Sequence, residues 1–290
     1  MLQPLTVQRS FTTWHLDVPV TVVAVAVVVL YLAAARRRTD WTTARTGSFL
    51  GAVGSLVVLR SSFLGVYDHA LFWPLAVQDV LLVTVVPLPL ALGRPLDLLP
   101  RRAPRLSIPP LLGSLVATTT LIAVYVWGWD QARLEHPWLF RVTQVVLLGA
   151  GLAFLGPLLG DGPTGYGRRT LVAFADGLLD AMPGLAILAG HGVIAASWYA
   201  VHHPTWAPTL AKDQQIGGTA MIALSELVGL PALLVLLVQW VRADAGTAAL
   251  IDAELDARAA DRGGDQDAVL ERPWWETDAG PLAHRLRDRD

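Results

Sequence analysis

The chain has 290 residues, of which 53% are hydrophobic and 16% are charged, and its formal net charge at pH 7 is −2. Soluble domains carry about 25% charged residues, so this composition excludes a mostly water-facing protein. The absence of cysteine excludes disulfides, thiolate metal ligands and cysteine nucleophiles. The sequence contains no Gly-rich phosphate loop, HExxH motif or nucleophile elbow, and we therefore expect that the protein is not an enzyme.

Apolar stretches that are long enough to cross a bilayer recur along the chain, since a membrane helix needs about 20 largely apolar residues. The pattern predicts an all-α fold, a polytopic membrane bundle of seven transmembrane helices within residues 18–242. An outer segment at 1–17 would precede this domain, and a tail at 243–290 would follow it. The predicted helices are 18–35, 46–67, 70–92, 108–129, 137–160, 170–198 and 217–241.

Basic residues set the orientation of the predicted helices, because positively charged loops remain in the cytoplasm. They follow the first, third, fifth and seventh helices, whereas the opposite connections carry few. We therefore expect a multi-pass plasma-membrane protein with its amino terminus outside and its carboxyl terminus in the cytoplasm. The basic residues on the predicted inner side are Arg36, Arg37, Arg38, Arg45, Arg94, Arg101, Arg102, Arg105, Arg168, Arg169 and Arg242.

The last 48 residues, 243–290, differ sharply from the rest in composition, with mixed charge and little apolar periodicity. Such a composition is typical of a largely disordered cytoplasmic tail. A short helix at 248–260 is the alternative interpretation.

Five of the seven histidines lie on the predicted outer side, and His284 lies on the inner side. The remaining one, His191, falls inside the sixth predicted helix at a depth of about 10 Å. Imidazole is a common metal ligand that suits copper, so one interpretation is an outward-facing copper-handling surface. The other is that these side chains only line the membrane interface, where amphipathic residues collect. The outer histidines are His15, His69, His136, His202 and His203.

Five polar residues are predicted to form one layer in the outer half of the bilayer, at depths of about 10–13 Å. They are Arg60, Asp79, Gln144, His191 and Glu226. Because a buried carboxylate needs a partner, we expect Arg60 to pair with Asp79 or Glu226. This layer is either a polar network that fixes the bundle or a site for an ion or metal.

The sixth predicted helix has two further features. Asp180 and His191 are eleven residues apart, which places them on nearly the same face of a continuous helix. Between them, Met182-Pro183-Gly184 predicts a kink or an opening of the helical backbone.

Four stretches of the sequence resemble the CtaG-type cytochrome c oxidase assembly factor family. They are "WHLD" (14–17), "LAVQDVLLVTVVPLPLALGRPL" (75–96), "GLAFLGPLLGDGP" (151–163) and "DQQIGGTAMI" (213–222). The last stretch resembles the family's DQQ-x-GG-x-x-M signature and is the most specific. Within it, Asp213, Gln214 and Gln215 would cap the outer start of the seventh helix, and Gly217 and Gly218 would allow close helix packing.

The resemblance implies a membrane protein that assists the maturation of a haem–copper oxidase, with copper as a possible cofactor on the outer side. Its partners would be terminal oxidase subunits or other assembly factors, within the lipid bilayer, and no nucleic acid. Typical members carry histidine pairs in the third and fifth helices, where this chain has Leu75 with Asp79 and Phe140 with Gln144. The candidate copper ligands are therefore His191, Asp79, His69 and Met221.

Two other functions stay open at this point. A divergent small-solute or proton-coupled transporter would use Arg60, Asp79 and Glu226, and would need a continuous polar path between the two faces. A membrane scaffold would keep the fold and lack the chemistry.

Overall fold

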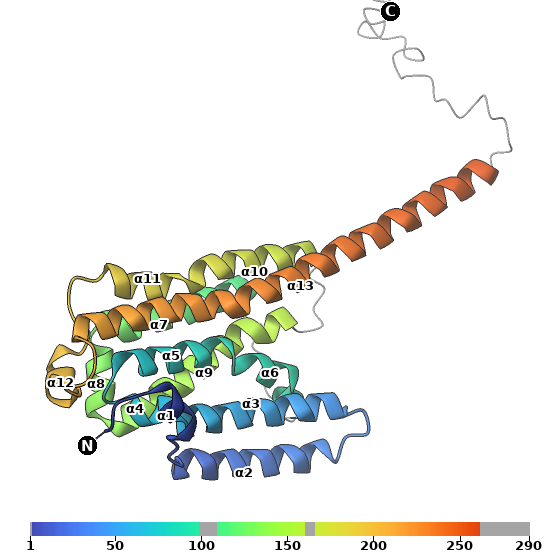
Figure 1. Ribbon diagram of the computed structural model, residues 1–290. Helices are drawn as coiled ribbons and strands as arrows, with labels where there is room; N and C mark the ends of the chain where they lie inside the picture. Colours follow the sequence, from blue (N-terminus) through green and yellow to red (C-terminus); the bar gives the residue numbers. More distant parts are fainter. Residues whose placement is uncertain (1, 99–108, 160–165, 262–290) are drawn as a thin grey trace, which may run out of the picture. The chain divides into compact units, whose positions relative to one another are not determined.

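The computed structural model describes residues 2–98, 109–159 and 166–261, and within these ranges every regular element is a helix (Figure 1). The chain divides into two compact units, Met1–Leu237 and Val238–Asp290. The helices of the first unit that begin before residue 100 are α1 (Val7–Thr12), α2 (Val18–Ala35), α3 (Thr43–Ser61), α4 (Phe63–Tyr67), α5 (Phe72–Thr84), α6 (Pro87–Leu92) and the short 3-10 helix η1 (Pro95–Leu98). Those that follow are α7 (Pro110–Val126), α8 (Trp129–Glu135), α9 (Pro137–Leu159), α10 (Tyr166–Asp180), α11 (Met182–Ala189), α12 (Ala196–His202) and α13 (Leu210–Asp261), the last of which continues into the second unit.

Five helical segments are long and apolar enough to cross a membrane, and the number is six if the bent pair α7 and α8 forms one span. The all-helical prediction is thus confirmed for the described residues, whereas the count of seven and the orientation stay predictions. The second predicted helix corresponds largely to α3, which has 19 residues but is not among these segments. The five segments are Val18–Ala35, Phe72–Leu92, Pro137–Leu158, Thr170–Ala189 and Leu210–Ala257.

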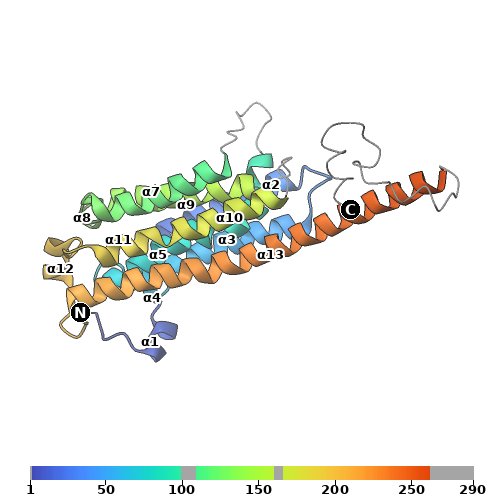
Figure 2. The same cartoon turned by 90° about the horizontal axis from the view of Figure 1, so that it is seen from above.

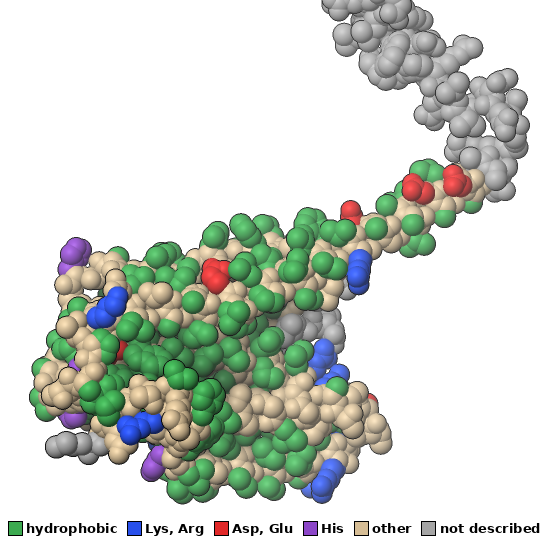
Figure 3. All heavy atoms as spheres, viewed as in Figure 1, with side chains coloured by type: hydrophobic (Ala, Val, Ile, Leu, Met, Phe, Trp, Pro, Cys, Tyr) green, Lys and Arg blue, Asp and Glu red, His purple; other side chains and the backbone are tan. Residues whose placement is uncertain are grey.

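The surface of these helices is itself apolar. On α2, Val22 is 61% exposed and Leu30 is 69% exposed. Figure 3 shows hydrophobic side chains spread over much of the visible face of the molecule. Side chains of this kind gain no stability from contact with water, so a surface made of them favours a lipid environment.

Proline and glycine residues break several of the predicted helices. Pro87 starts α6 after α5 has ended at Thr84, because proline supplies no N–H to continue the helical hydrogen bonds. Gly128, with φ of +73°, turns the chain between α7 and α8, which meet at 72°. The predicted helix at 46–67 likewise divides at Ser62, where the backbone is extended.

The sixth and seventh predicted helices differ most from the prediction. A break between Asp180 and Met182 separates α10 from α11, which agrees with the predicted kink. The segment predicted to continue to residue 198 leaves the helix after Ala189 and becomes helical again only in α12. Finally, α13 begins at Leu210 rather than at 217, and it extends through the part of the tail at 243–261, while 262–290 lie outside the described residues.

Helix α5 lies at the centre of the first unit, and Figures 1 and 2 both show it between neighbouring helices. Ten of its thirteen residues are buried, including Gln78 and Asp79. Apolar side chains such as Leu75 and Val80 form the main hydrophobic core with residues of α7, α9 and α13. The two polar residues must find their hydrogen-bond partners inside the protein, because buried polar groups are costly when unpaired.

Candidate functional site

Asp79 of α5 lies in a buried cluster of charges that we call the Arg133 cluster, formed by Asp79, Tyr125, Asp130 and Arg133. The guanidinium of Arg133 donates to both oxygens of Asp79, at 3.1 and 2.6 Å, and to Asp130 Oδ1, at 2.8 and 2.6 Å. The hydroxyl of Tyr125 donates to Asp79 Oδ2 at 2.5 Å. One guanidinium thus faces two carboxylates, and the side chains of all three groups are at most 2% exposed.

A second buried group, the Arg60 cluster, contains Asp17, Arg60, Asp68 and Gln78. Arg60 Nη1 donates to Asp68 Oδ2 at 2.5 Å and to Gln78 Oε1 at 2.7 Å, and Nη2 donates to Asp17 at 3.4 Å. The predicted pairing of Arg60 with Asp79 or Glu226 is therefore wrong. The chain turns back after α3, so it brings Asp68 to Arg60 before α5 begins.

Two further residues extend the Arg60 cluster toward the surface. Arg141 of α9 donates to both oxygens of Asp17, at 2.7 and 3.2 Å, and His69 Nδ1 lies 2.5 Å from Asp68 Oδ1. Burial raises the pKa of the Asp68 carboxyl, but the hydrogen bond with His69 and the charge of Arg60 outweigh burial. The pKa of Asp68 consequently lies below its ordinary value of 3.8.

Phe140 of α9 joins the two clusters. Its ring centroid lies 5.1 Å from the guanidinium carbon of Arg60 and 5.9 Å from that of Arg133. Such distances allow cation–π attraction to both groups. The clusters therefore connect α3, α5, α8 and α9 at one end of the bundle, which we call the cluster end.

The DQQ-x-GG stretch lies at the same end, and Asp213 contacts α5. Its carboxylate accepts from the backbone N–H groups of Phe72 at 2.8 Å and Trp73 at 3.2 Å. Asp213 therefore caps α5, not its own helix as the sequence predicted, because α13 has already begun at Leu210.

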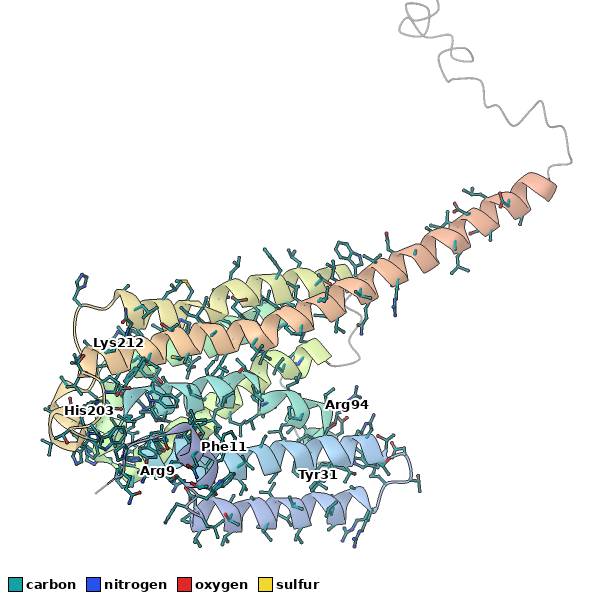
Figure 4. The ribbon with its side chains drawn as sticks, viewed as in Figure 1. Arg9, Phe11, Tyr31, Arg94, His203 and Lys212 are labelled. Atoms are coloured by element: carbon teal, nitrogen blue, oxygen red, sulfur yellow. The ribbon has the colours of Figure 1, made fainter. Side chains whose placement is uncertain are left out.

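Gln214 holds the loop that follows α11. Its Oε1 accepts from Ile194 N at 2.8 Å, and its Nε2 donates to Gly192 O at 3.1 Å and Ile187 O at 3.5 Å. Gln215 is exposed, and its Oε1 accepts from Lys212 Nζ at 3.0 Å. Figure 4 labels Lys212 at the start of α13.

The two glycines of the stretch pack closely against neighbouring helices, in agreement with the prediction. A Cβ atom at Gly217 would lie 2.7 Å from a ring carbon of Phe72. On the other side, a Cβ atom at Gly184 of α11 would lie 2.6 Å from the carbonyl oxygen of Gly218. Only glycine allows the two backbones to approach so closely.

The five residues of the predicted polar layer do not form one site. Arg60 and Asp79 belong to separate clusters, and Gln144 and Glu226 are half-buried on α9 and α13. His191 is exposed in the loop after α11, because the helix that was expected to contain it ends at Ala189. The predicted alignment of Asp180 with His191 on one helical face is wrong for the same reason.

Three carboxyl groups lie on the part of α10 and α13 further from the cluster end. Asp180 interacts electrostatically with Asp176, one turn away, and with Glu226 of α13. Ser114 of α7 lies beside Asp176. This group is separate from the Arg60 and Arg133 clusters.

The candidate copper ligands are also apart. His69 packs between the rings of Phe140 and Trp198, and Met221 is 1% exposed within the hydrophobic core. Asp79 already binds Arg133 and Tyr125. Across residues 2–98, 109–159 and 166–261, no three His, Asp or Glu side chains are grouped closely enough to hold a metal ion.

The polar atoms that the interior leaves without hydrogen-bond partners do not form a copper site either. Within the described part of the chain, most of them are oxygen atoms, such as the hydroxyl of Tyr199 and Asp130 Oδ2, whereas reduced copper prefers sulfur and imidazole ligands. One is an imidazole nitrogen, His203 Nε2, but it lies 3.4 Å from the carboxylate of Asp213 and, among the described residues, belongs to no group of three His, Asp or Glu side chains that could hold a metal ion. The described residues therefore offer no ligand set that fits a resident copper ion.

Most residues of the two clusters were absent from the sequence prediction. Asp130 and Arg133 were assigned to an outer connection, although their spacing of three residues on a helix predicts a local ion pair. Asp68 lies next to the candidate ligand His69, and Gln78 lies next to Asp79. This adjacency to predicted residues is the sequence signal that could have identified Asp68 and Gln78.

The fold and this site define a class, that of all-helical proteins with several apolar helices of membrane-spanning length and a network of buried charges at one end. A family model described as cytochrome c oxidase caa3 assembly factor matches residues 26–243. The chain belongs to this family.

Curated relatives occur in mycobacteria. The chain is 26% identical over 290 residues to an uncharacterized protein of Mycobacterium bovis and, equally, to one of Mycobacterium tuberculosis, and 25% identical over 291 residues to one of Mycobacterium leprae. Each alignment covers 89% of this chain and 44% of the relative, so the chain spans less than half the length of these proteins. No solved structure matches the chain significantly.

Proposed function

We propose that the protein is a membrane-embedded, non-enzymatic assembly factor for a haem–copper cytochrome c oxidase in the plasma membrane. The observation that carries this proposal is the family match over residues 26–243, which includes nearly every apolar helix of the first unit. Its partners would be oxidase subunits or other assembly factors that it meets within the bilayer.

We place the contact with these partners at the cluster end of the bundle. There the Arg60 and Arg133 clusters hold α3, α5, α8 and α9 in fixed positions, and Asp213 and Gln214 add α13 and the loop after α11. A surface supported by so many buried hydrogen bonds is preorganised for binding. The basic residues at the other end support an orientation in which the cluster end faces outward.

Copper handling on the outer side is a separate part of the proposal. Because the interior residues do not fit a resident ion, we propose that the protein acts on the oxidase by contact and that copper is not held within the bundle. Two members of the predicted ligand set could be reached by a copper carrier from solvent, namely His191, which is exposed, and His69, whose side chain is 45% exposed.

A transporter would use Arg60, Asp79 and Glu226 as a mobile polar path. Asp79 and Arg60 instead each make at least three hydrogen bonds with buried partners. This arrangement favours a static role for both residues, and it supports the assembly function over transport.

The experiment is deletion of the gene in its host, followed by measurement of assembled oxidase from its haem spectrum and of copper per oxidase. We expect both to fall and to be restored by the wild-type gene. A gene that encodes the Gly177→Ala variant should restore the oxidase level and its copper content equally well, because the added Cβ atom meets no other atom within 4 Å. A normal level of copper-loaded oxidase in the deletion strain would refute the proposal.

The copper part has its own measurement, which is the metal content of the purified protein after incubation with reduced copper. We expect less than one equivalent of bound copper in the wild type. One full equivalent that is lost in the His191→Ala variant would refute the absence of a resident ion, without affecting the assembly function.

A further inference from the structure

A cavity of about 380 Å³ opens at the cluster end, between the loop that follows α11 and the first turns of α13. Its lining includes Leu188, His191, Val193, Lys212 and Gln215. Neither the proposed contact with oxidase subunits nor the buried charge clusters account for it.

The cavity is built into the fold. Below it, α11 and α13 are in close contact through Gly184 and Gly218. Above that contact α11 ends at Ala189, and Gln214 holds the following loop through Ile194 N and Gly192 O. Since these hydrogen bonds fix the loop, the cavity is preorganised for a ligand.

Hydrogen-bond donors and one permanent positive charge face this cavity. Lys212 carries the charge, and Gln215 accepts from it through Oε1, which leaves the amide N–H₂ of Gln215 available to a ligand. The ring of His191 can supply a further donor. None of the described residues that line the cavity is a carboxylate, and neighbouring Asp213 points to the backbone of α5 instead.

The rest of the lining is apolar. Ile187, Leu188 and Val193 contribute hydrocarbon surface. Leu188 and its neighbour Leu185 are 38% and 48% exposed, so the apolar surface continues outside the cavity along α11. A ligand that matches both parts has an anionic head and an apolar chain.

We propose that this cavity binds the phosphate of an anionic phospholipid, with the head group at Lys212 and Gln215 and the acyl chains along α11. Among the polar residues of the DQQ stretch, Asp213 and Gln214 are used within the protein, whereas Gln215 is left exposed at the cavity. Lys212 lies in the first turn of a helix that is apolar enough to cross a membrane, close to where a head group would lie.

Native mass spectrometry of the full-length protein in detergent tests this proposal, with phosphatidylglycerol and phosphatidylcholine as probes. We expect the wild type to bind phosphatidylglycerol at least fivefold more tightly than phosphatidylcholine, which carries no net charge. The Lys212→Ala/Gln215→Ala variant should lose this preference, and Lys212→Arg should keep it. Because both residues are exposed, thermal unfolding of the variants should match that of the wild type.

Arg9→Ala is the matched control, since it removes one positive charge from the amino-terminal segment without touching the cavity. It should retain the preference for phosphatidylglycerol. Equal binding in the wild type and the double variant would overturn the proposal. Displacement of the lipid by millimolar inorganic phosphate would also overturn it, in favour of a site for free phosphate.

Discussion

Arg133 binds both carboxylate oxygens of Asp79, across 54 residues of sequence. Asp79 occupies a position where the resemblance to the family leads one to expect a histidine. The guanidinium of Arg133 therefore balances the charge of this carboxylate. Asp130 accepts from the same guanidinium, so the single positive charge of Arg133 serves both carboxylates of the Arg133 cluster.

The first prediction follows from this shared charge. Arg133→Ala should lower the free energy of unfolding by about 3–5 kcal/mol, because it leaves two buried carboxylates without a cation. Asp79→Asn should cost less, since Arg133 keeps its pair with Asp130. Thermal or denaturant unfolding in detergent measures both effects.

Arg141→Ala is the control for this prediction. Arg141 also pairs with a buried aspartate, Asp17, but its own side chain is 41% exposed, so its removal should cost less than about 1 kcal/mol. If Arg133→Ala and Arg141→Ala lower the free energy of unfolding equally, burial of the Arg133 cluster does not determine its contribution to stability.

The apolar runs were enough to predict an all-helical fold and most helix positions, because a long hydrophobic stretch has few structural alternatives. Breaks within these stretches were predicted only where proline and glycine occur together, as at Pro183 and Gly184. The depth of each polar residue was estimated on the assumption of continuous helices. That assumption failed after Ala189, and it moved His191 from a helix interior to an exposed loop.

The hydrogen-bond partners of the buried charged residues were harder to predict than the depths of these residues along their helices. Arg60 was expected to bind a carboxylate from another helix at the same level, but it bonds Asp68, eight residues away, through a turn that hydropathy does not show. The partners of Asp79 come from α7 and α8, which meet at 72°, and the guanidinium carbon of Arg133 lies 5.5 Å from the ring centroid of Tyr125. Long-range pairs of this kind depend on how helices pack, which a single sequence does not record.

The second prediction concerns the contact between α11 and α13. Gly184→Ala should lower the free energy of unfolding by about 1–3 kcal/mol, because the new methyl group would meet the backbone oxygen of Gly218 at 2.6 Å. Gly177→Ala is the matched control on α10, where a Cβ atom meets nothing within 4 Å. It should be neutral or stabilise by up to about 1 kcal/mol, since alanine favours the helix.

These two variants also have a functional outcome. If the proposed assembly function depends on the geometry of the cluster end, Gly184→Ala should reduce oxidase assembly and Gly177→Ala should not. Equal unfolding temperatures for the two variants would contradict the close contact between α11 and α13.

The third prediction concerns the cap that Asp213 provides for α5. Asp213→Ala should cost about 1–2 kcal/mol, because the N–H groups of Phe72 and Trp73 lose their acceptor in a buried position. Asp213→Asn keeps one carbonyl oxygen and should cost less. Hydrogen exchange at Phe72 and Trp73 should accelerate in the alanine variant, and unchanged exchange at both amides would contradict the capping role.

The fourth prediction uses the pH dependence of Asp68. Its pKa is lowered in the folded protein, so its ion pair contributes stability above the ordinary value of 3.8 and loses it as the pH falls through the lower folded value. The wild type should unfold at a higher temperature than Asp68→Asn at pH 6. The two unfolding temperatures should converge as the pH falls below about 4.

Asp40→Asn serves as the comparison for Asp68→Asn, because Asp40 pairs with Arg38 where both side chains are exposed. Exposed pairs contribute little, so this variant should match the wild type at both pH values. A constant gap between the wild type and Asp68→Asn from pH 6 to pH 3 would mean that Asp68 acts through packing and not through its charge. If the unfolding temperatures of the wild type and Asp68→Asn converge as the pH falls, and Asp40→Asn matches the wild type throughout, the buried charges of the Arg60 cluster stabilise this end of the bundle.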